Sequence, residues 1–361
     1  MSAAPTIPQG RIRSLDQFRG YTVAGMLLVN FIGGFREVGA IWKHHNTYCS
    51  YADTIMPQFF FAVGFAFRLT FPRRVERLGR IAAYRAAISR SLGLILLGLV
   101  IYHLDGDVKS WSELVDLGPG GVLARAFRRE PFQTLVHIGL TALWILPVIG
   151  ASTRALGVYL VASAALHLGL SHLFYFEHAW TLPVIDGGPL GFLSWSIPTL
   201  VGALACDAVA GRPEGANPVP RLVLWSAVLM AIGYGLSCLG QPTPPPPFVQ
   251  PASREGVNLW TMSQRTGSVS YQTFGAGFSL AVYALFYVLC DLGSFGLGLF
   301  RTFGQNALAS YIVHPMVASA VKPYAPNDSP LWYVLAAFLL YFVICYLFIR
   351  QLEKSGIFLR L

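Results

Sequence analysis

The stretch TIMPQFFFAVGFAFRLTF, residues 54–71, is apolar over almost its whole length and contains a single charged side chain, Arg68. A helix needs about 20 predominantly apolar residues to cross the hydrocarbon core of a bilayer. Pro57 falls close to the start of the stretch, where the loss of one backbone N–H is tolerated. The stretch therefore predicts a membrane-spanning helix over residues 54–72.

The composition of the whole chain agrees with this interpretation. Of its 361 residues, 54% are hydrophobic and 12% are charged, whereas a soluble domain carries about 25% charged residues. Apolar side chains must therefore face lipid. Residues 1–10 are expected to be disordered, and residues 11–361 are expected to form a single all-α, polytopic transmembrane domain. About ten apolar segments are long enough to be spans: 20–35, 54–72, 88–104, 132–150, 155–172, 190–210, 221–240, 272–293, 299–320 and 331–349.

The positive charges predict the orientation of these spans. Cytoplasmic links are enriched in Lys and Arg, and the link after residue 72 holds the densest group of arginines. With ten spans, both termini then lie in the cytoplasm. The net charge of +9 indicates contact with anionic lipid rather than with nucleic acid. The arginines that support this topology are Arg11, Arg13, Arg19, Arg68, Arg73, Arg74, Arg77, Arg80, Arg85 and Arg90, and the exceptions on the outer side are Arg125, Arg128 and Arg129.

Motifs for metal or nucleotide chemistry do not appear in a usable context. The five cysteines include no CxxC pair, which argues against a zinc site or a disulfide framework. HExxH, GxSxG, Walker A and GxGxxG patterns are also missing, so no metal is expected. Isolated histidines in or beside spans are each more easily explained by structure than by catalysis: His103, His137, His167, His172 and His178.

The segment KHHNTYCSYAD, residues 43–53, precedes the opening stretch and lies in an outward loop of this topology. His44 and His45 share it with Asp53, and a carboxylate can fix the tautomer of an imidazole and raise its basicity. The pattern indicates an acid–base site. The alternative is a polar surface loop in which Asp53 only caps the next helix.

Polar residues inside two other spans indicate a site at the same depth. Asn30 lies near the outward end of the first span. Asn306, Ser310 and His314 follow one another at four-residue steps, so they share one helix face, with Tyr311 beside them. Such a polar stripe must face protein or water rather than lipid. Hydrogen bonding between helices is the alternative explanation.

The segment NLWTMS, residues 258–263, lies in the outward link before the span at 272–293. Asn258, Thr261 and Ser263 are candidates to line the polar mouth of a site, with Trp260 among them. Trp260 also suits an interfacial anchor.

Five stretches occur in an order that resembles the heparan-alpha-glucosaminide N-acetyltransferase family of multi-span acyltransferases, which has many bacterial members. They are RIRSLDQFRG (11–20), LLVN (27–30), YADTIMPQFFFAVG (51–64), VNLWTMS (257–263) and FGQNALASYIVH (303–314). The resemblance implies transfer of acetyl from acetyl-CoA to a terminal glucosamine amine across a membrane, and a bacterial inner membrane as the location. It also implies that His44, preceded by Lys43, is catalytic together with Asn30, Asp53 and His314.

The chain departs from the family pattern near this histidine and in the later spans. The loop from His44 to Asp53 is one residue shorter, so His45 remains an alternative catalytic residue. TYCSY replaces the W-N-G pattern, and His137 in LVH replaces an arginine. VIDGGPLG keeps only Asp186 of the family's D-P-E-G. These positions leave the acceptor open, both its identity and the choice of N- or O-acetylation.

Two routes remain open for the implied chemistry. His44 either removes a proton from the acceptor amine as a general base or first takes the acetyl group covalently, and Asn30 is suited to stabilise the oxyanion. Basic residues at span edges are expected to meet the CoA phosphates, namely Arg19, Arg68 and Arg301. The expected partners are membrane lipids, acetyl-CoA and an amino-sugar or glycan acceptor, with a homodimer left open.

Two other classes of function compete with the acyltransferase. A proton-coupled transporter of a small polar or glycan-related solute also suits a polar stripe with broken helices, although no internal repeat is visible. A non-catalytic membrane scaffold is disfavoured by the polar residues clustered on the outward side. Release of CoA thiol in the presence of an amino sugar distinguishes the enzyme from both.

Overall fold

The computed structural model describes residues 12–103, 108–126, 131–181, 186–211, 216–241, 243–251 and 256–359. The disorder expected for residues 1–10 lies outside these ranges. Within them the regular structure is helical, with no strand. The expected all-α fold is therefore confirmed for the described part of the chain.

Seven helical segments are long and apolar enough to cross a membrane. They coincide with the spans predicted at 54–72, 88–104, 155–172, 190–210, 221–240, 272–293 and 331–349. The exposed surface of several is aliphatic, as in Val158 at 71%, Leu224 at 61% and Leu339 at 61% exposed, which suits contact with lipid. The helices are α2 (Tyr51–Leu78), α3 (Arg80–His103), α6 (Thr153–Leu170) continued by a π-turn into α7 (Phe176–Thr181), α8 (Gly191–Ala210), α9 (Val219–Ser237), α10 (Val269–Phe286) and α13 (Leu331–Lys354).

The three other predicted spans take different forms. The first is α1 (Arg13–Ile32), which begins earlier than the predicted apolar run and includes its charged start. The span predicted at 132–150 contains α5 (Thr134–Ile145), whose 12 residues rise only about 18 Å at 1.5 Å per residue. The span predicted at 299–320 is divided at Asn306 into α11 (Gly298–Gln305) and α12 (Ala307–Val321).

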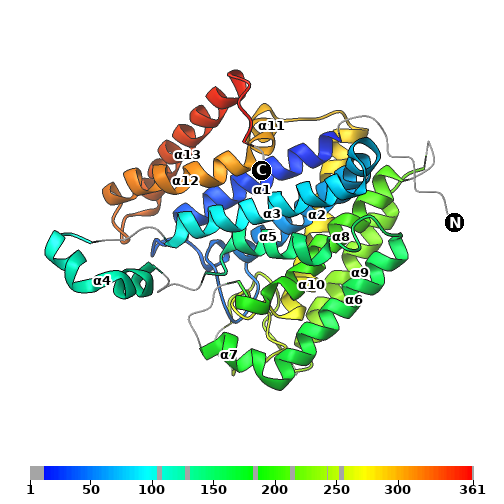
Figure 1. Ribbon diagram of the computed structural model, residues 1–361, viewed down its shortest axis with the longest axis horizontal. Helices are drawn as coiled ribbons and strands as arrows, with labels where there is room; N and C mark the ends of the chain where they lie inside the picture. The colour runs from blue at the N-terminus through cyan, green and yellow to red at the C-terminus, as the bar shows by residue number, and fades with distance from the viewer. Residues whose placement is uncertain are drawn as a thin grey trace.

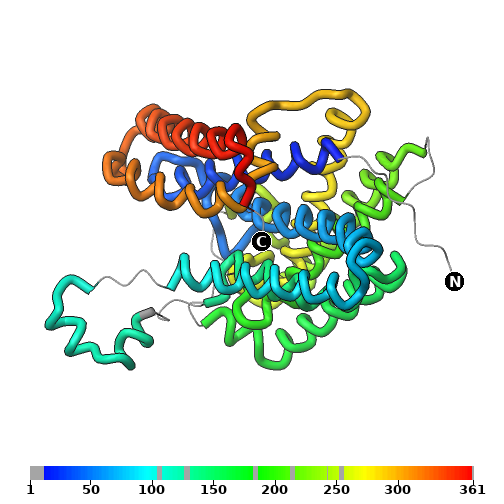
Figure 2. Tube along the Cα trace, turned by 45° about the horizontal axis from the view of Figure 1, so that its top comes forward, coloured from blue at the N-terminus to red at the C-terminus, as the bar shows by residue number. Residues whose placement is uncertain are grey.

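Helix α4 (Trp111–Ala126) forms within the region predicted as a polar link. It projects away from the body of the molecule, beyond the end of α3 (Figures 1 and 2). Trp111, Val115 and Leu123 on this helix are 78%, 59% and 61% exposed. Its position between α3 and α5 places it at the same end of the bundle as the loop before α2.

Helix α2 lies at the centre of the bundle, where it packs against α1, α8 and α10. Two glycines make its contact with α8 close. A Cβ on Gly64 would stand 1.7 Å from the carbonyl oxygen of Thr199, and one on Gly202 would stand 2.0 Å from that of Phe61. Small residues of this kind let membrane helices approach backbone to backbone. Polar residues on α2 are therefore held in fixed positions.

The break at Asn306 positions α12 along α1. Gly304 of α11 approaches the carbonyl of Asp16, and Gly20 approaches that of Phe300, so neither position has room for a side chain. From there α12 runs beside α1 toward the latter's C-terminal end, with α13 packed on both (Figure 1). The polar residues of α12 therefore reach the end of α1 that carries Asn30.

Candidate functional site

The site begins with the N-terminus of α2. Ser50 is the N-cap, and its hydroxyl accepts the backbone N–H of Asp53 at 3.3 Å. The Asp53 carboxylate accepts the backbone N–H of Ser50 at 2.9 Å in return, which completes a capping box. Asp53 is only 1% exposed, and the hydroxyl of Tyr271 on α10 donates to its carbonyl at 2.6 Å. The predicted capping role of Asp53 is present, but it uses only part of the carboxylate.

The remaining capacity of that carboxylate is directed at His44. Nδ1 of His44 lies 3.0 Å from Oδ1 of Asp53, so the imidazole places its Nδ1–H on the carboxylate, and Nε2 is the ring nitrogen that can accept a proton. The His44 side chain is 48% exposed. A buried carboxylate behind an accessible imidazole is the arrangement that a general base or a nucleophile requires.

The surroundings of His44 raise its pKa above the ordinary value of 6.5. Desolvation acts in the opposite direction, but the hydrogen bond and the negative charge of Asp53 outweigh it. The charge of Asp186 and the side chain of Gln264 add to the increase. His44 therefore holds a proton more firmly than a free imidazole does.

His45 is used differently. Its Nε2–H donates to the carbonyl of Ala40 at 2.8 Å, and its ring stacks on Tyr48 with centroids 4.4 Å apart. Its backbone N–H donates to the Asp53 carboxylate at 3.3 Å. These contacts shape the loop, so between the two histidines the geometry favours His44 for chemistry.

Asp186 is the acidic group of this region that sequence reasoning noted only as the remnant of a family motif. It is 3% exposed. Its carboxyl accepts from Nε2 of Gln264 at 2.6 Å and lies 3.5 Å from the hydroxyl of Thr134 on α5. Desolvation raises the pKa of Asp186 to about 6, against the opposing effects of Gln264, His44 and Thr134. Asp186 and His44 thus form an electrostatically coupled pair.

Gln264 and Thr134 were not predicted as site residues. Gln264 directly follows the NLWTMS segment that was proposed to line the mouth. The Oε1 atom of Gln264 is buried and finds no hydrogen-bond donor among the described residues. The sequence pointed to Gln264 only through its position next to the NLWTMS segment. It contained no feature that would have identified Thr134 as a site residue.

The NLWTMS residues themselves build the turn that carries Gln264. The Asn258 side chain accepts the backbone N–H of Trp260 at 2.9 Å, and the carbonyl of Trp260 accepts the hydroxyl of Ser270 at 2.8 Å. The backbone N–H of Ser263 donates to Ser268 at 3.1 Å. These contacts favour a structural role for Asn258, Trp260 and Ser263 over the predicted substrate contact.

A second polar pair links α1 to α12. Nδ2 of Asn30 lies 3.5 Å from Nε2 of His314, whose Nδ1 lies 2.7 Å from the carbonyl of Tyr311. The Nδ1–H therefore donates to that carbonyl, and Nε2 accepts from Asn30. The Lys322 ammonium donates to the carbonyl of Asn30 at 3.0 Å. The structure brings Asn30 and His314 together across nearly the whole length of the chain.

Tyr311 lies between the second pair and the surroundings of Asp186. No hydrogen bond joins His44 or Asp53 to Asn30 or His314 within the described ranges. The Tyr311 ring lies 5.5 Å from that of His314, and its hydroxyl is hydrogen-bonded to Tyr102 of α3. Both tyrosines interact electrostatically with Asp186. The predicted convergence of all four residues on one cavity remains a prediction.

The rest of the α12 stripe is buried. Asn306 is fully buried, and its amide has no hydrogen-bond partner in the part of the chain that the structure describes. The Ser310 hydroxyl donates to the carbonyl of Asn306 at 3.0 Å. Ser310 is thus satisfied within its own helix, whereas Asn306 lies at the break between α11 and α12 with free hydrogen-bonding capacity.

Of the predicted cofactor residues, Arg68 is the most fully engaged. Its guanidinium donates to both oxygens of Asp207 on α8, at 2.7 and 3.1 Å, and to the carbonyl of Ile149 at 2.6 Å. Its side chain is 7% exposed. This geometry favours a structural role for Arg68 over contact with CoA phosphates.

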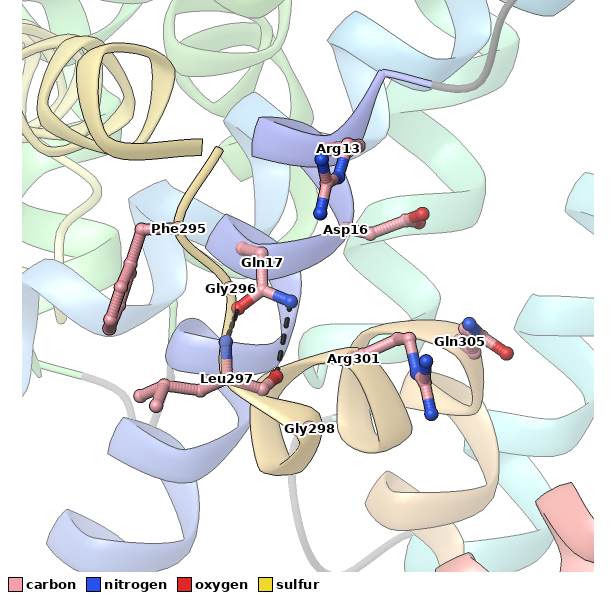
Figure 3. A pocket seen from close by; sticks show the side chains of 9 residues that line it. All are labelled: Arg13, Asp16, Gln17, Phe295, Gly296, Leu297, Gly298, Arg301 and Gln305. Carbon is pink, nitrogen blue, oxygen red and sulfur yellow. Dashed lines mark hydrogen bonds between the residues drawn. The ribbon is translucent and has the colours of Figure 1, made fainter. Parts of the chain in front are cut away.

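Arg19 and Arg301 lie at the other end of α1 from Asn30. Arg301 lines a pocket of about 200 Å³ together with Arg13, Gln17 and Gln305 (Figure 3). Gln17 closes one wall by bonding the N–H and carbonyl of Leu297 at 3.0 and 3.1 Å. Arg19 and Arg74 act electrostatically on Arg90. Acidic side chains share this end of the molecule, since Asp16 lines the same pocket and Arg301 pairs with Glu353 at 3.6 Å. The predicted phosphate contacts of Arg19 and Arg301 stay predictions.

Comparisons with known proteins add no assignment. No protein-family model matches this chain, and no curated protein sequence matches it. Among the described residues, no group of three or more His, Cys, Asp or Glu side chains is placed to hold a metal ion.

Proposed function

We propose that this protein is a membrane-embedded acyltransferase that moves acetyl from acetyl-CoA to an amino sugar or a related glycan acceptor. The observation that supports it best is the His44–Asp53 pair, with Nδ1 held at 3.0 Å and the ring 48% exposed. The N-acetyltransferase resemblance of the surrounding stretches points to the same residue independently of this geometry.

The reaction balances with His44 as the proton carrier. His44 Nε2 takes one proton from the acceptor ammonium, and the freed nitrogen lone pair attacks the thioester carbonyl. A C–N bond forms, the C–S bond breaks, and the CoA thiolate leaves with the bonding electrons and receives the proton from His44. The second proton on nitrogen passes to solvent. In the covalent alternative, His44 Nε2 attacks the thioester first.

Asp53 stabilises the imidazolium in the general-base route. Its carboxylate faces Nδ1 and stays in place through the capping box. Asn30 retains amide capacity beyond its contact with His314, so it is suited to donate to the oxyanion of the tetrahedral intermediate. The arginines Arg19 and Arg301 at the other end of α1 are suited to bind CoA phosphates.

The proposed topology has ten crossings with both termini in the cytoplasm. Helices α1 and α5 and the broken α11–α12 unit supply the three crossings beyond the seven long apolar helices. The support is the arginine-rich end at Arg19, Arg74 and Arg90, opposite the His44 loop. Thiol labelling of an Arg80→Cys variant from the outer side of the membrane would contradict this topology.

Purified protein in detergent or vesicles tests the activity directly. With acetyl-CoA and glucosamine, the expected result is release of free CoA thiol together with an N-acetylated product. Glucose serves as the matched acceptor without an amine. Thiol release that does not depend on any acceptor would indicate hydrolysis and contradict transfer.

A proton-coupled transporter is the second candidate, and the Asp186–His44 pair favours it. The pKa of Asp186 is raised to about 6 by burial, the pKa of His44 is raised above its ordinary value by Asp53, and the two groups influence one another, as proton-coupling groups do. Uptake of labelled glucosamine into vesicles under an imposed proton gradient, without acetyl-CoA, is the result expected of a transporter and not of the enzyme.

A further inference from the structure

Asp186 occupies a backbone conformation that needs support. Its φ is +60°, followed by Gly187 at +89° and Gly188 at +59°. A non-glycine residue in the left-handed region is uncommon and persists only where the surroundings hold it. Here the indole N–H of Trp195 donates to the Asp186 carbonyl at 2.6 Å, and the N–H of Gly187 donates to Arg265 at 3.0 Å. The turn directs a buried carboxyl group toward Gln264 and Thr134, where it acts electrostatically on His44.

The two donors to this carboxyl are neutral and unequal. Oδ1 receives the short 2.6 Å bond from Gln264, whereas the one contact of Oδ2 with the described residues is with Thr134 at 3.5 Å. The thioether of Met56 lies beside both donors, at 3.7 and 3.9 Å. A buried carboxylate is costly unless a positive charge or several strong donors accompany it. Oδ2 is therefore the oxygen with capacity for a further donor.

Among the charged and titratable groups that act on Asp186, one can carry a positive charge. They come from the loop before α2 and from α2, α3, α10 and α12: His44, Asp53, Tyr102, Tyr271 and Tyr311. Of these only His44 becomes a cation. The guanidinium of Arg265, on the turn that carries Gln264, instead lies over the Trp180 ring at 5.1 Å.

We propose that Asp186 is the subsite for the ammonium group of the acceptor, held on the carboxylate through Oδ2 before His44 removes its proton. The inference rests on the proposed function, since it takes the amine acceptor as the ligand. A protonated amine supplies the missing cation and three donors, and it stands next to the base that deprotonates it. Loss of the proton weakens its hold on the carboxylate and frees the nitrogen for attack.

The Asp186→Asn variant tests the subsite. Asn has the same shape, tolerates the left-handed backbone and keeps an oxygen for Gln264. Binding of glucosamine to the full-length protein is measured by calorimetry at pH 7.5 without acetyl-CoA, so the readout needs no turnover. Loss of a hydrogen bond to a charged group predicts roughly 10- to 100-fold weaker binding. Binding of glucose should be the same in both proteins, and Asp116→Asn on exposed α4 is the matched control.

The pH dependence of the wild-type protein gives a second test that needs no variant. Protonation of Asp186 removes its charge, so glucosamine binding should weaken as pH falls through about 6. Protonation of His44 acts in the same direction, and for this reason the profile is compared with that of Asp186→Asn, in which the Asp186 component disappears.

The possible outcomes separate the two proposals. Equal glucosamine affinity in the wild type and in folded Asp186→Asn overturns the subsite, and so does a wild type that binds glucose as tightly as glucosamine. Amine-specific binding that depends on Asp186, without any N-acetylated product when acetyl-CoA is added, supports the subsite and overturns the acyltransferase. If Asp186→Asn does not fold, Thr134→Val is measured instead. This variant removes only the weak contact at Oδ2, so it should still bind glucosamine, and its binding should weaken with falling pH as in the wild type. Loss of this pH dependence in Thr134→Val would contradict the proposal.

Discussion

Helix α2 carries two acid–base pairs, and they are built in opposite ways. Near its middle, Arg68 donates to both oxygens of Asp207 and to a carbonyl, and its side chain is 7% exposed. At its N-terminus, Asp53 is equally buried, but its partner His44 is half-exposed and bonds Asp53 through one of its two ring nitrogens. In the first pair both members are largely buried, and both oxygens of Asp207 are already bonded to Arg68. A pair is suited to chemistry when one side chain is held in place by its hydrogen bonds and the other still has a hydrogen-bonding atom that a substrate can reach.

The largest expected effect comes from His44→Ala. Loss of a general base lowers a rate by about 10²- to 10⁴-fold, and loss of an acyl acceptor should lower it further. The melting temperature should change little, because the removed side chain is half-exposed. Initial rates of CoA thiol release and a thermal unfolding curve check both statements.

His45→Ala is the control on the same loop. It removes the contact with the Ala40 carbonyl and the stacking on Tyr48, so it should disturb the loop more than the chemistry. Normal transfer by both single variants and by the double variant would show that the loop is not the site.

Arg68→Met should act on stability instead. Removing one partner of a buried ion pair typically costs about 3–5 kcal/mol, because the other charge is left without compensation. Denaturant unfolding in detergent measures this loss. Addition of Asp207→Leu should restore much of it, whereas an Arg68→Met protein as stable as the wild type would contradict the structural role and reopen the contact with CoA.

Asn30→Ala should lower kcat by about 10²- to 10³-fold, the usual cost of removing an oxyanion donor, with little change in KM for acetyl-CoA. His314→Ala is the matched variant on the partner helix. If His314→Ala lowers kcat and Asn30→Ala does not, the amide only orients the imidazole of His314, and the oxyanion assignment is wrong.

The smallest expected effect is a displacement of the pH profile. The active form of His44 is neutral, and its pKa is raised above 6.5, so kcat/KM should climb with pH through a midpoint above 6.5. Asp53→Asn keeps a capping side chain but removes the charge that stabilises the imidazolium. The midpoint should then fall, because a charge that favours the protonated imidazole has been removed. An unchanged midpoint would mean that the observed titration belongs to another group.

Part of the fold could be predicted from apolar length alone. Seven predicted spans coincide with long apolar helices because about 20 apolar residues leave a chain few alternatives in lipid. The span at 299–320 was predicted as one helix, yet it breaks at Asn306. The break accompanies the close backbone contacts of Gly20 and Gly304 between α1 and α11, and apolar periodicity within one segment carries no information about such contacts.

For the site, the sequence by itself determined which residue types stand together in the KHHNTYCSYAD loop, and so it indicated His44, His45 and Asp53. It did not separate the two histidines, because both lie within reach of Asp53 along the chain. Only the tertiary structure decided that His44 faces the carboxylate and His45 faces Ala40. It also brought Asp186 and Gln264 to His44, since their proximity depends on how α2, α8 and α10 pack and on a left-handed turn, neither of which is local to the loop.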